Sequence, residues 1–175
     1  MPSLHSPKIE VLIVDDEVQA RELLSEFCRA QGYEVATADD GRAAIAALTR
    51  SPQQFKIVIT DLQLPGADGF EVLTAARHGN PSVYVVMITG YASIDSAVRA
   101  VREGAYDYLT KPFALGQLEI VLRHIRDRMS LEEENRELSR RVVGNESHAG
   151  DITRRLQAIE ERLAHIEALL RARQP

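Results

Sequence analysis

Reactive polar side chains stand directly after four apolar runs of this sequence, which end near residues 14, 60, 88 and 110. In chain order the side chains are Asp15 with Asp16, Asp61, Thr89 and Lys111. If the four runs are parallel strands of one sheet, these side chains meet at the edge where open α/β sheets bind their ligands. Three carboxylates, a hydroxyl and an ammonium group can hold a divalent cation and accept a phosphoryl group.

Phosphoryl transfer by such a group assigns one role to each side chain. Asp61 is the candidate phosphoryl acceptor because it ends a central apolar run. Asp15 and Asp16 offer the oxygen ligands that Mg²⁺ prefers, and the ion would neutralise charge on the phosphoryl oxygens. Lys111, one of three lysines against eighteen arginines, can supply a second positive contact. Thr89 can donate a hydrogen bond to a phosphoryl oxygen.

Each residue also has an ordinary explanation. The Asp15–Asp16 pair can be a helix N-cap signal, and Asp61 can be a turn residue. Thr89 can be a strand-end cap, and Lys111 can be a solvated charge. Their occurrence at four successive strand ends favours a common site over four separate coincidences.

The spacing of apolar residues indicates the elements that position these side chains. Strands are predicted at 9–14, 34–38, 57–61, 83–88 and 106–109, and helices at 17–31, 41–50, 68–78 and 93–103. Alternating strands and helices predict an α/β fold, a parallel sheet covered by helices on both faces.

The residues quoted above, with Gly90, Tyr108 and Pro112, resemble the receiver domain of two-component response regulators, most specifically in the segments 60–69 and 106–113. The resemblance covers about residues 8–125. It implies a flavodoxin-like (βα)5 doubly wound sheet of five parallel strands in the order 2-1-3-4-5. It also implies Mg²⁺-dependent phosphorylation of Asp61 by a sensor histidine kinase or a histidine phosphotransfer protein, followed by self-catalysed dephosphorylation. A flavin-binding flavodoxin is not favoured, because the loop after the first run is acidic.

The resemblance further assigns metal ligands. It implies that Asp16, Asp61 and the backbone carbonyl of Gln63 bind the Mg²⁺ ion, and that Asp15 acts through a water molecule.

The resemblance also implies a switch. Thr89 would move to the phosphoryl group and Tyr108 would turn inward behind it, and the Lys111–Pro112 peptide bond is expected to be cis. The segment 90–113 and the helix containing residues 131–138 look most like nitrogen-regulatory receivers, in which an ATPase domain and a DNA-binding helix-turn-helix follow.

The composition changes after Phe113. Following a receiver over residues 1–125, we predict a long last helix over 115–143, a break at 144–150 and a second helix over 151–173. Core positions of the second helix repeat every seven residues: Leu156, Leu163 and Leu170 at a, and Ile152, Ile159 and Ile166 at d. This heptad pattern predicts a coiled coil, and Leu at a with Ile at d favours more than two strands.

Charges beside the heptad core favour parallel pairing. Arg155 and Arg162 fall at g, and Glu160 and Glu167 fall at e, so a parallel partner places opposite charges together. The alternative is an amphipathic helix that folds back on its own domain. We expect a homo-oligomer through this coiled coil, with docking of a downstream protein as a further possibility.

The rest of the sequence limits the function classes. No glycine precedes a lysine, so no G-x-x-x-x-G-K-[ST] phosphate loop is present and we expect no ATPase activity. Residues 117–175 contain equal numbers of acidic and basic residues, which disfavours DNA binding. A phosphorelay intermediate or phosphate sink stays open as an alternative, because its receiver chemistry would be the same.

Composition places the chain among globular proteins. Its 175 residues are 45% hydrophobic with a net charge of −5. No apolar run approaches the roughly 20 residues of a membrane span, and residues 1–8 do not resemble a signal peptide, so we expect a cytoplasmic protein. The single cysteine, Cys28, is expected to be a buried, unreactive thiol.

Overall fold

Five parallel strands form one sheet in the order β2-β1-β3-β4-β5. The computed structural model describes residues 9–140. The strands are β1 (Glu10–Val14), β2 (Glu34–Ala38), β3 (Ile57–Asp61), β4 (Tyr84–Thr89) and β5 (Asp107–Thr110). The helices between them are α1 (Val18–Ala30), α2 (Gly41–Arg50), α3 (Gly69–Gly79) and α4 (Ile94–Glu103). The predicted flavodoxin-like fold and strand order are confirmed.

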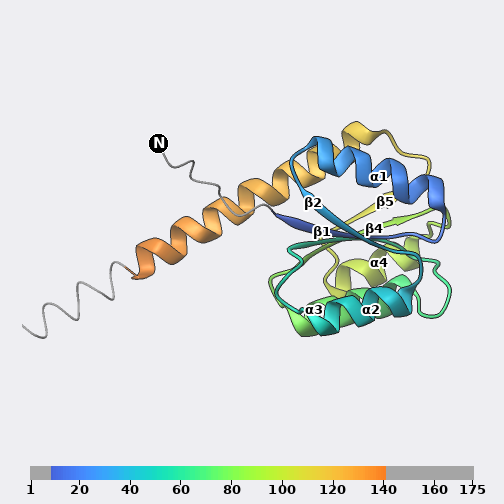
Figure 1. The fold of residues 1–175 in the computed structure, drawn as a ribbon, viewed down its shortest axis with the longest axis horizontal. Coiled ribbons are helices and arrows are strands. Elements are labelled where there is room, and N and C mark those ends of the chain that lie inside the picture. Colours follow the sequence, from blue (N-terminus) through green and yellow to red (C-terminus); the bar gives the residue numbers. More distant parts are fainter. Residues whose placement is uncertain (1–8, 141–175) are drawn as a thin grey trace, which may run out of the picture. The chain divides into compact units, whose positions relative to one another are not determined.

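Helices cover both faces of the sheet. Figure 1 shows α1 on one face and α2, α3 and α4 on the other. The middle strands are therefore buried on both sides, which explains their consecutive apolar residues: every residue of β3 and β4 is buried. The main core cluster lies between the sheet and α2, α3 and α4, and includes Val58, Leu73 and Met87.

Strand register brings the carboxyl ends of the strands to one edge. Val14 pairs with Thr60, Asp61 pairs with Ile88, and Thr89 pairs with Thr110. The residues that follow these positions therefore emerge together, as the sequence predicts.

The observed bounds lie within one residue of the predicted ones for every strand and for the four helices. Four of the small differences are capping residues that the prediction included in the helices: Glu17, Gln31, Asp68 and Ser93. Asp68 caps α3, where its side chain accepts the N–H of Glu71, and Ser93 caps α4, where its side chain accepts the N–H of Ser96.

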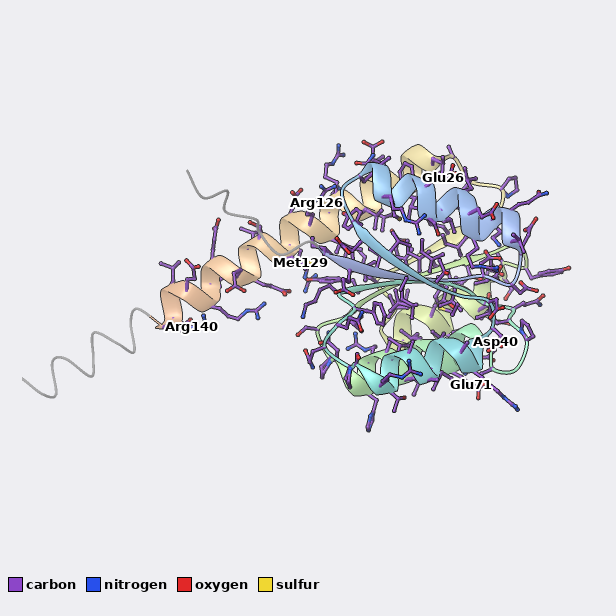
Figure 2. All side chains as sticks on the ribbon, viewed as in Figure 1. Glu26, Asp40, Glu71, Arg126, Met129 and Arg140 are labelled. Atoms are coloured by element: carbon purple, nitrogen blue, oxygen red, sulfur yellow. The ribbon has the colours of Figure 1, made fainter. Side chains whose placement is uncertain are left out.

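A further helix occupies residues 115–140, in agreement with the start predicted for the last helix. The chain divides into two units, one ending at Arg123 and the other beginning at His124. In the first unit, the hydroxyl group of Tyr33 donates to the carbonyl oxygen of Leu122 at 3.3 Å. In the second, the side chains of Arg126 and Arg140 project from the helix (Figure 2). The predicted end of this helix at residue 143, the break at 144–150 and the coiled-coil helix over 151–173 lie outside the described residues.

Cys28 lies on the buried side of α1 and has no exposed surface. Burial raises the pKa of its thiol to about 12, so the thiol stays protonated at neutral pH, and the predicted burial of the cysteine is confirmed. Among the helices of residues 9–140, none is both long and apolar enough to span a bilayer.

Candidate functional site

Lys111 joins two carboxylates at the carboxyl edge of the sheet. Its Nζ lies 2.7 Å from Asp15 Oδ2 and 2.8 Å from Asp61 Oδ2. The three residues come from the ends of β1, β3 and β5, which are far apart in the sequence. Parallel strand order therefore assembles the acidic pair and the amine, as the sequence predicts.

The two carboxylates keep the Lys111 amine charged. Burial by itself would lower the pKa of this lysine, but the hydrogen bonds from its amine to Asp15 and Asp61, together with their negative charges, raise the pKa above its ordinary value. The site therefore holds a fixed positive charge at neutral pH beside the candidate acceptor.

Asp15 is almost completely buried, with 1% of its surface exposed. Its Oδ1 accepts the backbone N–H of Glu17 at 3.0 Å, and its backbone carbonyl accepts Nη1 of Arg21. Glu17 is the N-cap residue of α1, and no side chain caps that helix. The contacts with Glu17 and Lys111 therefore hold the Asp15 carboxylate in place. Asp15 is not the N-cap residue of α1, so the alternative explanation of a helix cap does not apply to it.

Asp61 ends β3 and faces a local turn. Its Oδ1 accepts the backbone N–H of Gln63 at 2.9 Å, which fixes the orientation of the carboxylate. The first residue of α3 approaches this turn closely: Gly69 donates its N–H to the carbonyl of Leu62 at 2.9 Å. A Cβ atom at Gly69 would meet the backbone carbonyl of Asp61, so glycine is required for this approach.

Asp61 opens into a pocket of about 930 Å³. The pocket is also lined by Asp16, Gln63 and Lys111. Asp16 is exposed, and no hydrogen bond or ion pair involves its carboxylate within residues 9–140. Each oxygen of the Asp61 carboxylate accepts one hydrogen bond, which leaves lone pairs available.

These donors fit a hard divalent cation. No group of three or more His, Cys, Asp or Glu side chains in the described part of the chain has the arrangement of a complete metal site. Mg²⁺ does not need one, because it usually takes one or two carboxylates and keeps several waters. The carboxylates of Asp16 and Asp61 provide such a partial set beside open volume, and Gln63 lines the same volume.

Thr89 and Tyr108 lie on neighbouring strands. Thr89 is fully buried, and its Oγ1 accepts the N–H of Tyr91 at 3.1 Å. It therefore caps the strand end, as the ordinary explanation required. Its backbone carbonyl accepts the N–H of Lys111 at 2.8 Å.

The Tyr108 hydroxyl lies 2.8 Å from Oγ of Ser96 on α4. The Lys111–Pro112 peptide bond is cis.

Sequence reasoning missed two residues of α4 that bear on the site. Ser96 was detectable, because the Ser93–Ser96 spacing is that of a capping box. Arg99 lines the acceptor pocket, and its Cζ lies 3.8 Å from the centroid of the Phe70 ring. No sequence signal identifies Arg99, because the contact joins α3 and α4 across the surface.

Comparison with known proteins agrees with this geometry. A family model described as the response regulator receiver domain matches residues 11–123. The response regulator protein FleR of Pseudomonas aeruginosa is 40% identical over 116 residues, which are 66% of this chain and 24% of FleR. The nitrogen assimilation regulatory protein NtrX of Azorhizobium caulinodans is 36% identical over 132 residues, which are 74% of this chain and 28% of NtrX. The chain thus spans about a quarter of the length of these curated relatives.

A solved structure has the same fold. The response regulator receiver domain protein from Clostridium thermocellum superposes with a TM-score of 0.66 at 28% sequence identity. The match covers 70% of this chain and 98% of that one.

Proposed function

Because the chain belongs to the response regulator receiver domain family, we propose that it accepts a phosphoryl group on Asp61 from a histidine kinase or a histidine phosphotransfer protein. The observation that carries the proposal is the double contact of Lys111 with Asp15 and Asp61, at 2.7 and 2.8 Å. A lysine held between two carboxylates at the edge of a parallel sheet places positive charge where a phosphoryl group would arrive.

In the proposed reaction, a carboxylate oxygen of Asp61 attacks the phosphorus atom of a phosphohistidine. A new P–O bond forms as the P–N bond breaks, and the electron pair of that bond stays on the imidazole nitrogen, which takes up a proton. The product is an acyl phosphate. The hydrogen bond from the Gln63 N–H supports this role by orienting the carboxylate before the attack.

The residues around Asp61 stabilise the transferred charge. Lys111 can move its hydrogen bond from Asp61 to a phosphoryl oxygen, and its raised pKa keeps it charged while it does so. A Mg²⁺ ion held by Asp16, Asp61 and the carbonyl of Gln63 would supply further positive charge to the phosphoryl oxygens. Thr89 would exchange its hydrogen bond with Tyr91 for one to the phosphoryl group.

The proposed chemistry is directed at the protein itself. Water would later cleave the acyl phosphate and regenerate the Asp61 carboxylate. We propose no ATPase activity for this chain.

The proposed output is self-association or docking of a partner through the C-terminal helices. Within the described part, Leu131 and Leu138 of the helix over 115–140 are 60% and 57% exposed. They lie one heptad apart and so project from one side of a helix, with Asn135 between them at a spacing that can fix register. Apolar side chains in this arrangement support pairing with another helix.

Acetyl phosphate with Mg²⁺ tests the acceptor directly. Intact-protein mass spectrometry should show one added phosphoryl group on the wild-type chain and none on Asp61→Asn. Asp68→Asn is the matched control, because Asp68 lines the same pocket and asparagine caps helices as well as aspartate. This control should still gain one phosphoryl group at Asp61. Equal labelling of Asp61→Asn and wild type would refute the assignment.

A further inference from the structure

Positive charge is scarce in the acceptor pocket. Four acidic side chains line it: Asp16, Glu17, Asp61 and Asp68. Among the described residues that line the pocket, Lys111 and Arg99 are the two cations. Any phosphoryl donor is an anion, so its approach to Asp61 is opposed by the four carboxylates and assisted by these two side chains.

Lys111 already has two partners, because its amine donates hydrogen bonds to the carboxylates of both Asp15 and Asp61. Its side chain is 24% exposed, compared with 55% for Arg99. The cation available to a donor that is still entering the pocket is therefore Arg99.

Arg99 is held in place by two contacts. Its guanidinium Cζ lies 3.8 Å from the centroid of the Phe70 ring, and its Nε lies 2.6 Å from Oε1 of Glu103. Phe70 is 5% exposed and directly follows Gly69, whose backbone contacts the turn after Asp61. The ring therefore holds the guanidinium group against the first turn of α3, in the same pocket as Asp61.

The terminal nitrogens of Arg99 stay available. No hydrogen bond or ion pair to Nη1 or Nη2 occurs within residues 9–140, and the side chain is 55% exposed. A planar guanidinium group offers paired N–H donors that match two oxygens of a phosphate.

We propose that Arg99 is a donor-binding residue that docks small dianionic phosphodonors, the acyl phosphates, at the mouth of the Asp61 pocket. The inference rests on the proposed function of Asp61 and deepens it by naming a residue that binds the donor. In this arrangement the terminal nitrogens of Arg99 hold the phosphoryl oxygens of the donor during entry, and the donor then passes to Lys111. The P–O bond of the acyl phosphate breaks as the bond to Asp61 forms, and the leaving carboxylate departs with the electron pair.

The test compares Arg99→Gln with wild type, using two donors of different charge. Acetyl phosphate is largely a dianion at neutral pH, whereas phosphoramidate carries a smaller net charge. The second-order rate constant for phosphorylation of Asp61 is measured for both donors with Mg²⁺, at low and high salt. We expect Arg99→Gln to lower the acetyl phosphate rate constant by about threefold, the size of one exposed ion pair. The effect on phosphoramidate should be smaller, and salt should reduce the difference.

Three further variants separate docking from a structural role. Arg99→Lys keeps the charge and should recover part of the rate. Glu103→Gln removes the charge of the Nε partner but keeps the guanidinium group, and should not reproduce the loss seen in Arg99→Gln. Arg102→Gln removes an exposed arginine of the same helix that does not line the pocket, and should match wild type.

The outcomes are distinct. An Arg99→Gln rate equal to wild type with acetyl phosphate overturns the inference. So does a loss that is the same for both donors or insensitive to salt, because that loss would report displacement of α4. Binding of beryllofluoride with Mg²⁺ at Asp61 should be unchanged in Arg99→Gln. If the wild-type chain itself is not modified at Asp61, the proposed function fails, and the inference fails with it.

Discussion

The hydroxyl groups of Tyr108 and Ser96 lie 2.8 Å apart and connect β5 to the first turn of α4. The same Ser96 hydroxyl accepts the backbone N–H of Ser93 at 3.0 Å, which is one half of the capping box of that helix. The Ser96 hydroxyl group therefore has two roles: it contacts the Tyr108 hydroxyl and it caps the N-terminus of α4. If Tyr108 turns inward on phosphorylation, as the family resemblance implies, Ser96 loses a partner at the moment when Thr89 moves.

Removal of the Ser96 hydroxyl group should favour the inward position of the Tyr108 ring. Ser96→Ala deletes the partner of Tyr108 and so removes a hydrogen bond worth about 1 kcal/mol from the observed ring position. We expect the inward position to become more populated without phosphorylation. The chain has five tyrosines, so 3-fluorotyrosine labelling and ¹⁹F NMR can follow the Tyr108 signal. In Ser96→Ala this signal should shift toward the position that beryllofluoride induces in the wild-type protein.

Ser93→Ala is the matched control for this shift. It removes the other side chain of the capping box but leaves the hydroxyl that contacts Tyr108. The Tyr108 signal should stay near its wild-type position in this variant. If the Tyr108 signal shifted equally in both variants, the shift would result from fraying of α4 and not from loss of the Ser96 contact.

Replacement of Lys111 by methionine should destabilise the protein. Lys111→Met keeps an unbranched apolar side chain but leaves the nearly buried Asp15 and Asp61 beside each other without a cation. Breaking a fully buried pair costs roughly 3–5 kcal/mol, and the 24% exposure of Lys111 reduces the expected loss to about 2 kcal/mol. Urea unfolding at pH 7.5 without Mg²⁺ measures the difference.

The pH dependence of that difference has a defined sign. The folded-state pKa of Lys111 is raised above its ordinary value of 10.5. Its pairing therefore contributes fully below pH 10.5, and the contribution disappears as the pH rises through the folded-state pKa. The stabilities of wild type and Lys111→Met should differ by a constant amount from pH 7 to pH 9 and converge above pH 10.5. A difference that grows with alkaline pH would contradict the raised pKa.

Gly69 should not tolerate a side chain. In Gly69→Ala the new methyl group would meet the Asp61 carbonyl and lie 2.9 Å from Cα of Leu62. Overpacking of this kind costs about 1–3 kcal/mol, and the backbone shift should also slow phosphorylation of Asp61. Gly116→Ala is the control, because no atom lies within 4 Å of its Cβ position and alanine favours helix. Thermal unfolding and acetyl phosphate labelling of both variants check the prediction.

The exposed leucines of the last described helix should contribute to assembly. A Leu131→Ser, Leu138→Ser double variant removes both apolar side chains of one helix face, and we expect its molar mass by light scattering to fall relative to wild type. A Glu133→Ser, Glu137→Ser variant alters the same helix at exposed polar positions away from these leucines and should keep the wild-type mass. Repeating the measurement with beryllofluoride and Mg²⁺ tests whether phosphorylation controls the assembly. An unchanged molar mass in the leucine variant would show that Leu131 and Leu138 do not contribute to assembly.

The parts of the molecule that depend on backbone periodicity were predictable from the sequence. β3 and β4 are recognisable because strands buried on both faces need consecutive apolar residues. Once those strands are parallel, Asp15, Asp61 and Lys111 must emerge at one edge, so their proximity follows from topology.

The contacts made by side chains across the surface were not predictable in this way. Arg99 and Phe70 meet because α3 and α4 pack side by side, and their separation in the sequence follows no period. The double use of the Ser96 hydroxyl depends on the rotamer of Tyr108, which no pattern of residue types encodes. The metal ligands were predictable only in part. Their residue types indicate them, but the coordinating geometry depends on the ion.

The burial of Cys28 makes the molecular surface of the folded receiver free of reactive thiols. The chain has one cysteine, and its thiol is fully covered with a pKa of about 12, so maleimides and similar reagents at neutral pH should leave it unmodified. A cysteine introduced at an exposed site such as Val101 would then be the one that reacts. A fluorophore or spin label can thus be attached to α4 in the otherwise native protein, which lets spectroscopy follow that helix during phosphorylation.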